Sequence, residues 1–141
     1  MKSAFQEFNQ IDGQIERSYH AAAVKMGLSD SELWILYTLV TNGSKMLQTE
    51  LISLTAMSKT TVNSALKKLE REGVLLLAQA GGRNICVSLT EKGVHLTEST
   101  VCRLVELENR IYESWSPTEQ AMLIRLNRDY ADKLADIVKS L

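Results

Sequence analysis

The stretch from Ser58 to Gly73 constrains the fold of this chain more than any other part of the sequence. Its apolar residues recur at the spacing of a helix that is buried along one side, at Val62, Ala65, Leu66 and Leu69. Ser58 is a good N-cap, and a glycine at position 73 suits the end of a helix. We therefore predict a helix over residues 58–72. Its exposed side is short, polar and basic, and carries Lys59, Thr60, Asn63, Ser64, Lys67 and Arg71.

The segments around this helix predict a larger unit. A capping box at Ser29 and Glu32 opens one helix, and residues 47–55 form a second, short helix that a tight turn joins to the helix 58–72. The short helix is expected to face inward through Leu47, Leu51 and Leu54. An apolar run, a turn signal and an alternating run then predict a β-hairpin over residues 74–89. Residues 29–93 are therefore predicted to form a winged helix-turn-helix.

This arrangement makes double-stranded DNA the candidate partner. The second helix of a helix-turn-helix enters the major groove, and the tip of a wing can reach the adjacent minor groove. Asn63 suits adenine, the lysines suit phosphates, and Arg83 at the wing tip suits the minor groove. Each lysine is as readily an ordinary solvated residue. The predicted DNA-contacting residues are Ser58, Lys59, Thr60, Thr61, Asn63, Ser64, Lys67, Lys68 and Arg83.

The charge distribution agrees with a specific binder better than with a protein that coats nucleic acid. The net charge of the 141-residue chain is only −1. Residues 45–93 nevertheless carry seven basic side chains against four acidic ones, whereas the segments before and after them are both net acidic. The positive charge is therefore concentrated around the helix 58–72, and the acidic flanks would discourage the rest of the surface from binding phosphate.

Long amphipathic helices are predicted on both sides of the winged helix. One covers residues 3–26, one runs from Thr90 to about Trp115, and one follows a capping box at Ser116 and Glu119. Their apolar stripes exceed what a winged helix can cover by itself. We expect residues 3–26 and 94–141 to form a homodimer within one domain of residues 1–141. Twofold symmetry would place two DNA-reading helices about 34 Å apart, on an inverted-repeat operator.

The sequence resembles the MarR family of bacterial transcriptional regulators over nearly its whole length. The resemblance lies in Met57, Thr60-Thr61, Leu69 and Gly73, and in the string Val87-Ser88-Leu89-Thr90-Glu91-Lys92-Gly93. The resemblance aligns Arg83 with the arginine of the family's Asp-x-Arg wing motif, but Gly81 stands in place of the aspartate. Leu76 and Leu77 replace basic residues of the wing, and Ser64 replaces a frequent arginine. We therefore expect a modest DNA binder, most simply a repressor.

The resemblance also implies a small aromatic or anionic ligand, held near Tyr19, His20, Trp34 and Tyr37. Aromatic residues on apolar stripes are more often core residues. Some relatives sense oxidants through a cysteine near the start of the first helix, but no cysteine precedes Cys86 here. Cys86 and Cys102 are expected to be small packing residues, because reactive thiols need an electropositive, exposed setting. A thiol-based sensor and a winged helix that contacts proteins or binds DNA weakly remain the alternatives.

Other classes of protein are disfavoured. The two histidines, His20 and His95, have no second metal ligand at helical spacing, and no cofactor motif is present. No nucleophile elbow, phosphate loop or carboxylate pair indicates an enzyme. No apolar run approaches the roughly 20 residues that cross a membrane. The 45% hydrophobic residues suffice for a core. Because the chain has only two cysteines and no signal-like N-terminus, we expect a mainly α-helical cytoplasmic protein with a small β-hairpin.

Overall fold

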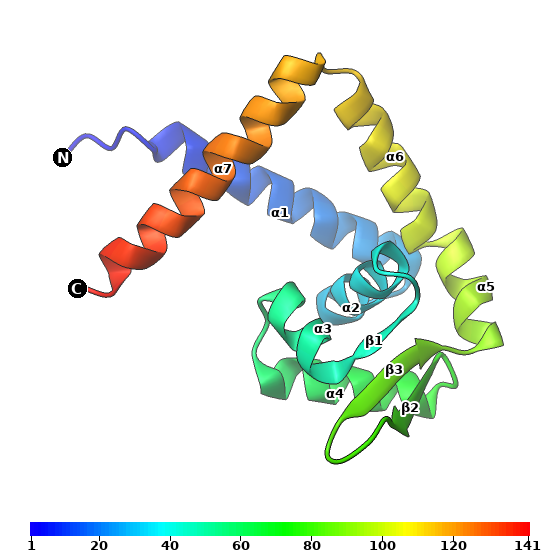
Figure 1. Ribbon diagram of the computed structural model, residues 1–141. Helices are drawn as coiled ribbons and strands as arrows, with labels where there is room; N and C mark the ends of the chain where they lie inside the picture. The colour runs from blue at the N-terminus through cyan, green and yellow to red at the C-terminus, as the bar shows by residue number, and fades with distance from the viewer. The chain divides into compact units, whose positions relative to one another are not determined.

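The computed structural model describes residues 1–141, which form seven helices and three strands (Figure 1). The elements in chain order are α1 (Gln6–Met26), α2 (Asp30–Thr41), β1 (Lys45–Leu47), α3 (Gln48–Thr55), α4 (Lys59–Arg71), β2 (Leu75–Gln79), β3 (Ile85–Leu89), α5 (Glu91–Ser99), α6 (Val101–Glu113) and α7 (Pro117–Val138). They divide into two compact units, Met1–Arg103 and Leu104–Leu141. The fold is therefore mainly helical with a small antiparallel sheet, as predicted.

The core of the first unit is built around α2. This helix packs against α1, α3, α4 and β1, so its side chains are covered in several directions. Leu33, Ile35, Leu36 and Leu39 are all buried, although they do not lie along one side of the helix. A helix that is apolar on most sides has to lie in the middle of a domain. α2 is thus the support on which the helix-turn-helix rests.

The sheet has one strand more than the predicted hairpin. Its strand order is β1-β3-β2, and both pairings are antiparallel. The buried Val87 in the central strand pairs with Met46 on one side and Leu77 on the other. Gly43 and Ser44 both have positive φ, 86° and 67°, and turn the chain from α2 into β1. Three residues are too few to show a β-strand period, which explains why the sequence did not reveal β1.

α3 differs from its prediction at one position. Leu51 is fully buried, but Leu54 is 59% exposed, so the expectation that Leu54 faces inward is wrong. Leu54 lies in the last turn of this eight-residue helix, directly before Ala56 turns the chain with a φ of 56°. The short length leaves only one turn of α3 in full contact with the core.

The predicted helix from Thr90 to Trp115 is divided into α5 and α6. Thr100 breaks it, with φ −125° and ψ −96°. The Thr100 hydroxyl donates to the carbonyl of Leu96 at 2.7 Å, and the Thr97 hydroxyl donates to those of Gly93 and Val94 at 3.0 Å. Threonine hydroxyls that bond to carbonyls of the preceding turn bend helices, and a pair of them here accompanies the break.

The second unit is the remainder of α6 together with α7. The capping box predicted at Ser116 and Glu119 is present, and Pro117 occupies the first turn of α7. No residue of α7 is buried, although it carries an apolar stripe. None of the helices in the chain combines the length and hydropathy required to cross a membrane.

Candidate nucleic-acid interface

α4 has the buried stripe and the N-cap that its sequence predicts. Val62, Ala65, Leu66 and Leu69 are buried, and the hydroxyl oxygen of Ser58 accepts a hydrogen bond from the Thr61 amide at 3.1 Å. The Ser58 hydroxyl also donates to the Thr61 hydroxyl at 2.8 Å. These two predicted DNA contacts are therefore bonded to each other at the start of α4, which fixes the beginning of the helix.

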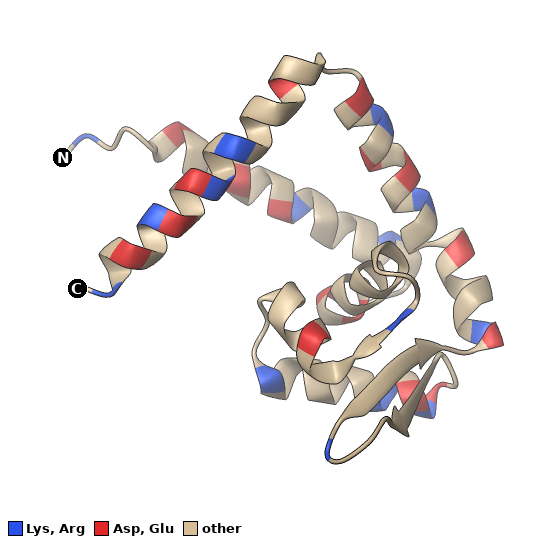
Figure 2. Ribbon diagram, viewed as in Figure 1, with Lys and Arg blue, Asp and Glu red and all other residues tan.

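The opposite side of α4 is exposed. Lys59, Thr60, Thr61, Ser64 and Lys67 are all exposed, and Asn63 is half-buried. Figure 2 shows basic residues near both ends of α4, with acidic residues beside them at its C-terminal end, and a basic residue in the loop between β2 and β3. The structure therefore brings six of the predicted contacts onto one accessible face of one rigid helix.

Asn63 has a partner that the sequence did not reveal. The side-chain amide of Gln48, the first residue of α3, donates a hydrogen bond to the carboxamide oxygen of Asn63. The Gln48 side chain does not cap α3, which has no side-chain cap. The two residues are 15 positions apart, so only the packing of α3 beside α4 brings them together.

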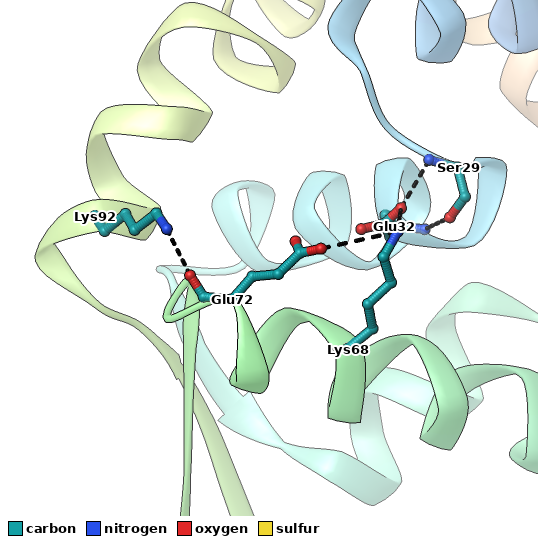
Figure 3. A network of polar contacts seen from close by, with 5 residues as sticks. All are labelled: Ser29, Glu32, Lys68, Glu72 and Lys92. Atoms are coloured by element: carbon teal, nitrogen blue, oxygen red, sulfur yellow. Dashed lines mark hydrogen bonds and ion pairs between the residues drawn. The ribbon is translucent and has the colours of Figure 1, made fainter.

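Lys68 lies on a different side of α4 from the other lysines. Its ammonium lies 3.2 Å from a carboxylate oxygen of Glu32, a residue of α2 that is only 3% exposed, and 4.0 Å from the Glu72 carboxylate (Figure 3). The Glu32 carboxylate also accepts a hydrogen bond from the Ser29 amide at 2.9 Å. Burial by itself would raise the pKa of Glu32. The hydrogen bonds from Ser29 and the ion pair with Lys68 outweigh it and hold that pKa below its ordinary value.

The end of α4 is tied to the segment that follows the wing. The Thr90 hydroxyl donates to the Gly73 carbonyl at 2.6 Å, and the Lys92 ammonium donates to the Glu72 carbonyl at 2.6 Å (Figure 3). Gly93 packs so closely that a methyl group on it would overlap the Val74 carbonyl oxygen. The string Thr90-Glu91-Lys92-Gly93 thus holds the end of α4 and the segment after the wing together.

The wing tip is a loop of residues 80–84 that its own backbone closes. The Ala80 amide donates to the Asn84 carbonyl at 3.0 Å, and the Asn84 amide donates to the Gly81 carbonyl at 3.1 Å. Gly81 has a φ of 111°, a backbone conformation that residues other than glycine rarely adopt. A glycine in place of the aspartate of the family motif therefore fits the local backbone. Arg83 is exposed at this tip.

The predicted ligand residues are only partly brought together. Tyr19, Trp34 and Tyr37 form a half-buried aromatic cluster of α1 and α2, with ring centroids 4.8 Å apart for Tyr19 and Trp34 and 5.3 Å apart for Trp34 and Tyr37. His20 is exposed, and its Nδ1 lies 2.9 Å from the Asp30 carboxylate. Three of the four residues therefore share one site, and the histidine makes its contact outside that cluster.

The cysteines do not form a disulfide. Cys86 lies on the central strand β3 and Cys102 on α6, and both are half-buried free thiols. Three or more His, Cys, Asp or Glu side chains that could share a metal ion do not occur together anywhere in the chain.

The helices α3 and α4 are joined by a tight turn, rest on α2 and are followed by the hairpin of β2 and β3. This arrangement defines the winged helix-turn-helix class of nucleic-acid-binding proteins. Residues 26–83, which include most of this unit, match the model of the MarR family. No curated protein matches the chain in sequence.

Solved structures of MarR regulators have the same fold over nearly the entire chain. NMB1585, a MarR family regulator from Neisseria meningitidis, is similar with a TM-score of 0.86 at 17% identity, over 99% of both chains. NadR in complex with 4-hydroxyphenylacetate has a TM-score of 0.73 at 18% identity, over 93% of this chain and 94% of that one. The S. aureus MepR–DNA complex has a TM-score of 0.72 at 16% identity, over 95% of this chain and 99% of that one.

Proposed function

We propose that the chain is a DNA-binding transcriptional regulator that acts as a homodimeric repressor on an inverted-repeat operator. The observation that carries this proposal is the exposed polar and basic face of α4. The opposite face of this helix is buried, and a wing follows it, as in the MarR fold. MepR, a protein with a similar fold, was solved in complex with DNA. We propose no catalytic role for the chain.

The contacts divide into those that read bases and those that hold the backbone. Thr60, Asn63 and Ser64 are proposed to face base edges, with Asn63 on adenine, and Thr61 and Ser58 to lie beside the phosphates at the start of α4. Lys59 and Lys67 are exposed and available to phosphates. Arg83 is proposed to enter the minor groove. Lys68 is assigned a structural part instead, because its ammonium is paired with the buried Glu32 carboxylate.

The proposal of a homodimer rests on apolar side chains that the single chain leaves exposed. They lie at 12 positions of three helices: Phe5, Phe8, Ile11 and Ile15 at α1, Leu107 and Ile111 on α6, and Met122, Leu123, Leu126, Leu134, Ile137 and Val138 on α7. So many exposed large apolar residues are typical of a protein interface. A twofold dimer would cover them and present two copies of α4 to one DNA duplex.

A small aromatic or anionic ligand that releases the DNA is proposed for the cluster of Tyr19, Trp34 and Tyr37. Aromatic rings within 4.8 to 5.3 Å of each other offer the stacking surface that such a ligand needs. NadR, a structure of the same fold, holds 4-hydroxyphenylacetate. Thermal-shift measurements with phenolic acids test this part, and we expect Trp34→Ala to abolish any stabilisation. Melting temperatures that no compound raises would contradict it.

The central experiment is selection of bound sequences from random DNA, followed by mobility shifts on the selected sequence. We expect an inverted repeat with half-sites one helical turn apart. Asn63→Ala should reduce the preference for one base pair by about 1–3 kcal/mol. Arg83→Ala should lower the free energy of operator binding by a smaller amount. Lys139→Ala, at the end of α7, is the control and should bind as the wild type does.

Two outcomes of that experiment would count against the proposal. Binding that ignored both Asn63→Ala and Arg83→Ala would refute the assignment of the contacts. Absence of binding at low salt would favour the alternative of a protein-contacting winged helix. That alternative has one observation in its support, since Leu76 on the wing is 55% exposed.

A further inference from the structure

We propose that Gln48 is a positioning residue for base recognition, because it holds the Asn63 carboxamide in the orientation that reads adenine. The inference rests on the proposed DNA-binding function and extends it to a residue of α3. The pair joins the two helices of the helix-turn-helix through their side chains. Of Thr60, Asn63 and Ser64, the residues proposed to face bases, Asn63 is the one whose side chain is bonded to another helix.

The backbone at Gln48 is fixed on both sides. Leu47, the preceding residue, pairs with Cys86 in the sheet, and Leu51, one turn later, is fully buried in the core. The Gln48 side chain does not cap its own helix and instead crosses to α4. A side chain that starts from a fixed backbone and ends on Asn63 restricts the rotation of the Asn63 carboxamide.

The hydrogen-bonding capacity of Asn63 remains sufficient for a base. A carboxamide has two acceptor lone pairs on its oxygen and two donor hydrogens on its nitrogen. Gln48 occupies one lone pair of the oxygen. One lone pair and both donor hydrogens are left, which match the N6 donor and the N7 acceptor of adenine in the major groove. Gln48 therefore orients the group and leaves its adenine-reading atoms available.

Orientation before binding has a physical benefit. A half-buried side chain that is already held in its bound geometry loses less conformational freedom when DNA arrives. It also disfavours the flipped carboxamide, which would present a donor where adenine itself donates. Loss of Gln48 should therefore reduce the preference for one base pair more than the affinity for DNA in general.

The test is a double-mutant cycle in the full chain with Gln48→Met, Asn63→Ala and the double variant. Affinities are measured on the selected operator, on the operator with the Asn63-dependent base pair replaced, and on random DNA. Gln48→Met should weaken operator binding about two- to tenfold, the equivalent of one hydrogen bond, and leave binding to random DNA unchanged. It should have no further effect once Asn63 is alanine. Ser53→Ala, an exposed substitution on the same helix, is the control.

A second variant covers the case in which Gln48→Met fails to fold. Gln48→Glu keeps the length of the side chain, but a carboxylate only accepts hydrogen bonds, so it should turn the Asn63 carboxamide over and lower the preference for adenine. Wild-type discrimination in a folded variant, or an effect fully additive with Asn63→Ala, would overturn the inference and leave the proposed function standing. A wild-type chain that selects no DNA sequence would overturn both.

Discussion

The two compact units of this chain use apolar residues in opposite ways. Every buried hydrophobic residue lies between Ala23 and Val101, within the first unit. In the second unit no residue of α7 is buried, and the leucine, isoleucine, valine and methionine side chains of that helix are exposed. The first unit therefore has a core of its own, although Phe5, Phe8, Ile11 and Ile15 at α1 stay exposed. The second unit leaves the apolar stripe of α7 uncovered. We propose that a second copy of the chain covers these exposed apolar residues.

The largest effect on stability should come from the close contact between Gly93 and the Val74 carbonyl in the first unit. Gly93→Ala should lower the free energy of unfolding by about 3 kcal/mol, because the added methyl group would overlap the Val74 carbonyl oxygen and lie 3.1 Å from the Leu89 side chain. Chemical denaturation measures this change. Gly13→Ala is the matched control, since its methyl group meets only Arg17 at 3.9 Å, and it should stabilise α1 by about 0.5–1 kcal/mol. Equal effects of the two would contradict the role of Gly93.

The next largest effect should be on association through the second unit, with the first unit still folded. Leu126→Glu combined with Leu134→Glu places charges on the exposed apolar stripe of α7, and we expect dimer dissociation to rise at least about a hundredfold, near 2.7 kcal/mol. Analytical ultracentrifugation measures it. The circular dichroism of the first unit should be retained, since its core is elsewhere. Asn127→Glu is the control, and a double variant that dimerises as the control does would refute the assigned interface.

A smaller effect tests the ion pair beneath the reading helix. Glu32→Gln should cost about 1–2 kcal/mol at neutral pH, because it removes the pairing with Lys68 while keeping an acceptor for the Ser29 amide. The folded-state pKa of Glu32 lies below its ordinary value of 4.5, so its contribution is present above pH 4.5 and is lost as the pH falls through the folded value.

Denaturation curves from pH 7 down to pH 3 measure that difference. We expect the gap between wild type and Glu32→Gln to narrow below pH 4.5. Glu119→Gln is the comparison in the second unit, where the Ser116 hydrogen bonds also hold the pKa below its ordinary value but the carboxylate is exposed. A gap that is constant with pH would show that Glu32 is not ionised in the fold.

The smallest effect distinguishes two lysines of the same helix. Lys59→Ala should reduce the slope of log affinity against log salt by about 1.8 in the proposed dimer, which is about 0.9 for each of its two phosphate contacts. Lys68→Met should leave that slope unchanged and lower stability instead, because its ammonium is paired with Glu32. Affinity titrations at several salt concentrations measure both slopes. A reduced slope for Lys68→Met would return this residue to the DNA contacts.

Local signals were sufficient for much of the fold. The apolar stripe of α4, the caps at Ser58, Ser29 and Ser116, and the hairpin were all predicted, since each depends on residues within one or two turns of each other. The strand β1 was missed because its stability comes from pairing with β3, some 40 positions later in the chain. The break at Thr100 was missed because apolar spacing continues through it.

The sequence by itself determined which face of α4 is buried, because helical spacing assigns each side chain a direction. Only the tertiary structure decided what the exposed side chains do. It paired Asn63 with Gln48 and Lys68 with Glu32, contacts that span 15 and 36 positions. No local pattern encodes such pairs, since they depend on how α2 and α3 pack against α4. Two polar residues of α4 thus make different contacts in the fold: the Asn63 carboxamide bonds to Gln48, and the exposed Lys68 ammonium bonds to the buried Glu32 carboxylate.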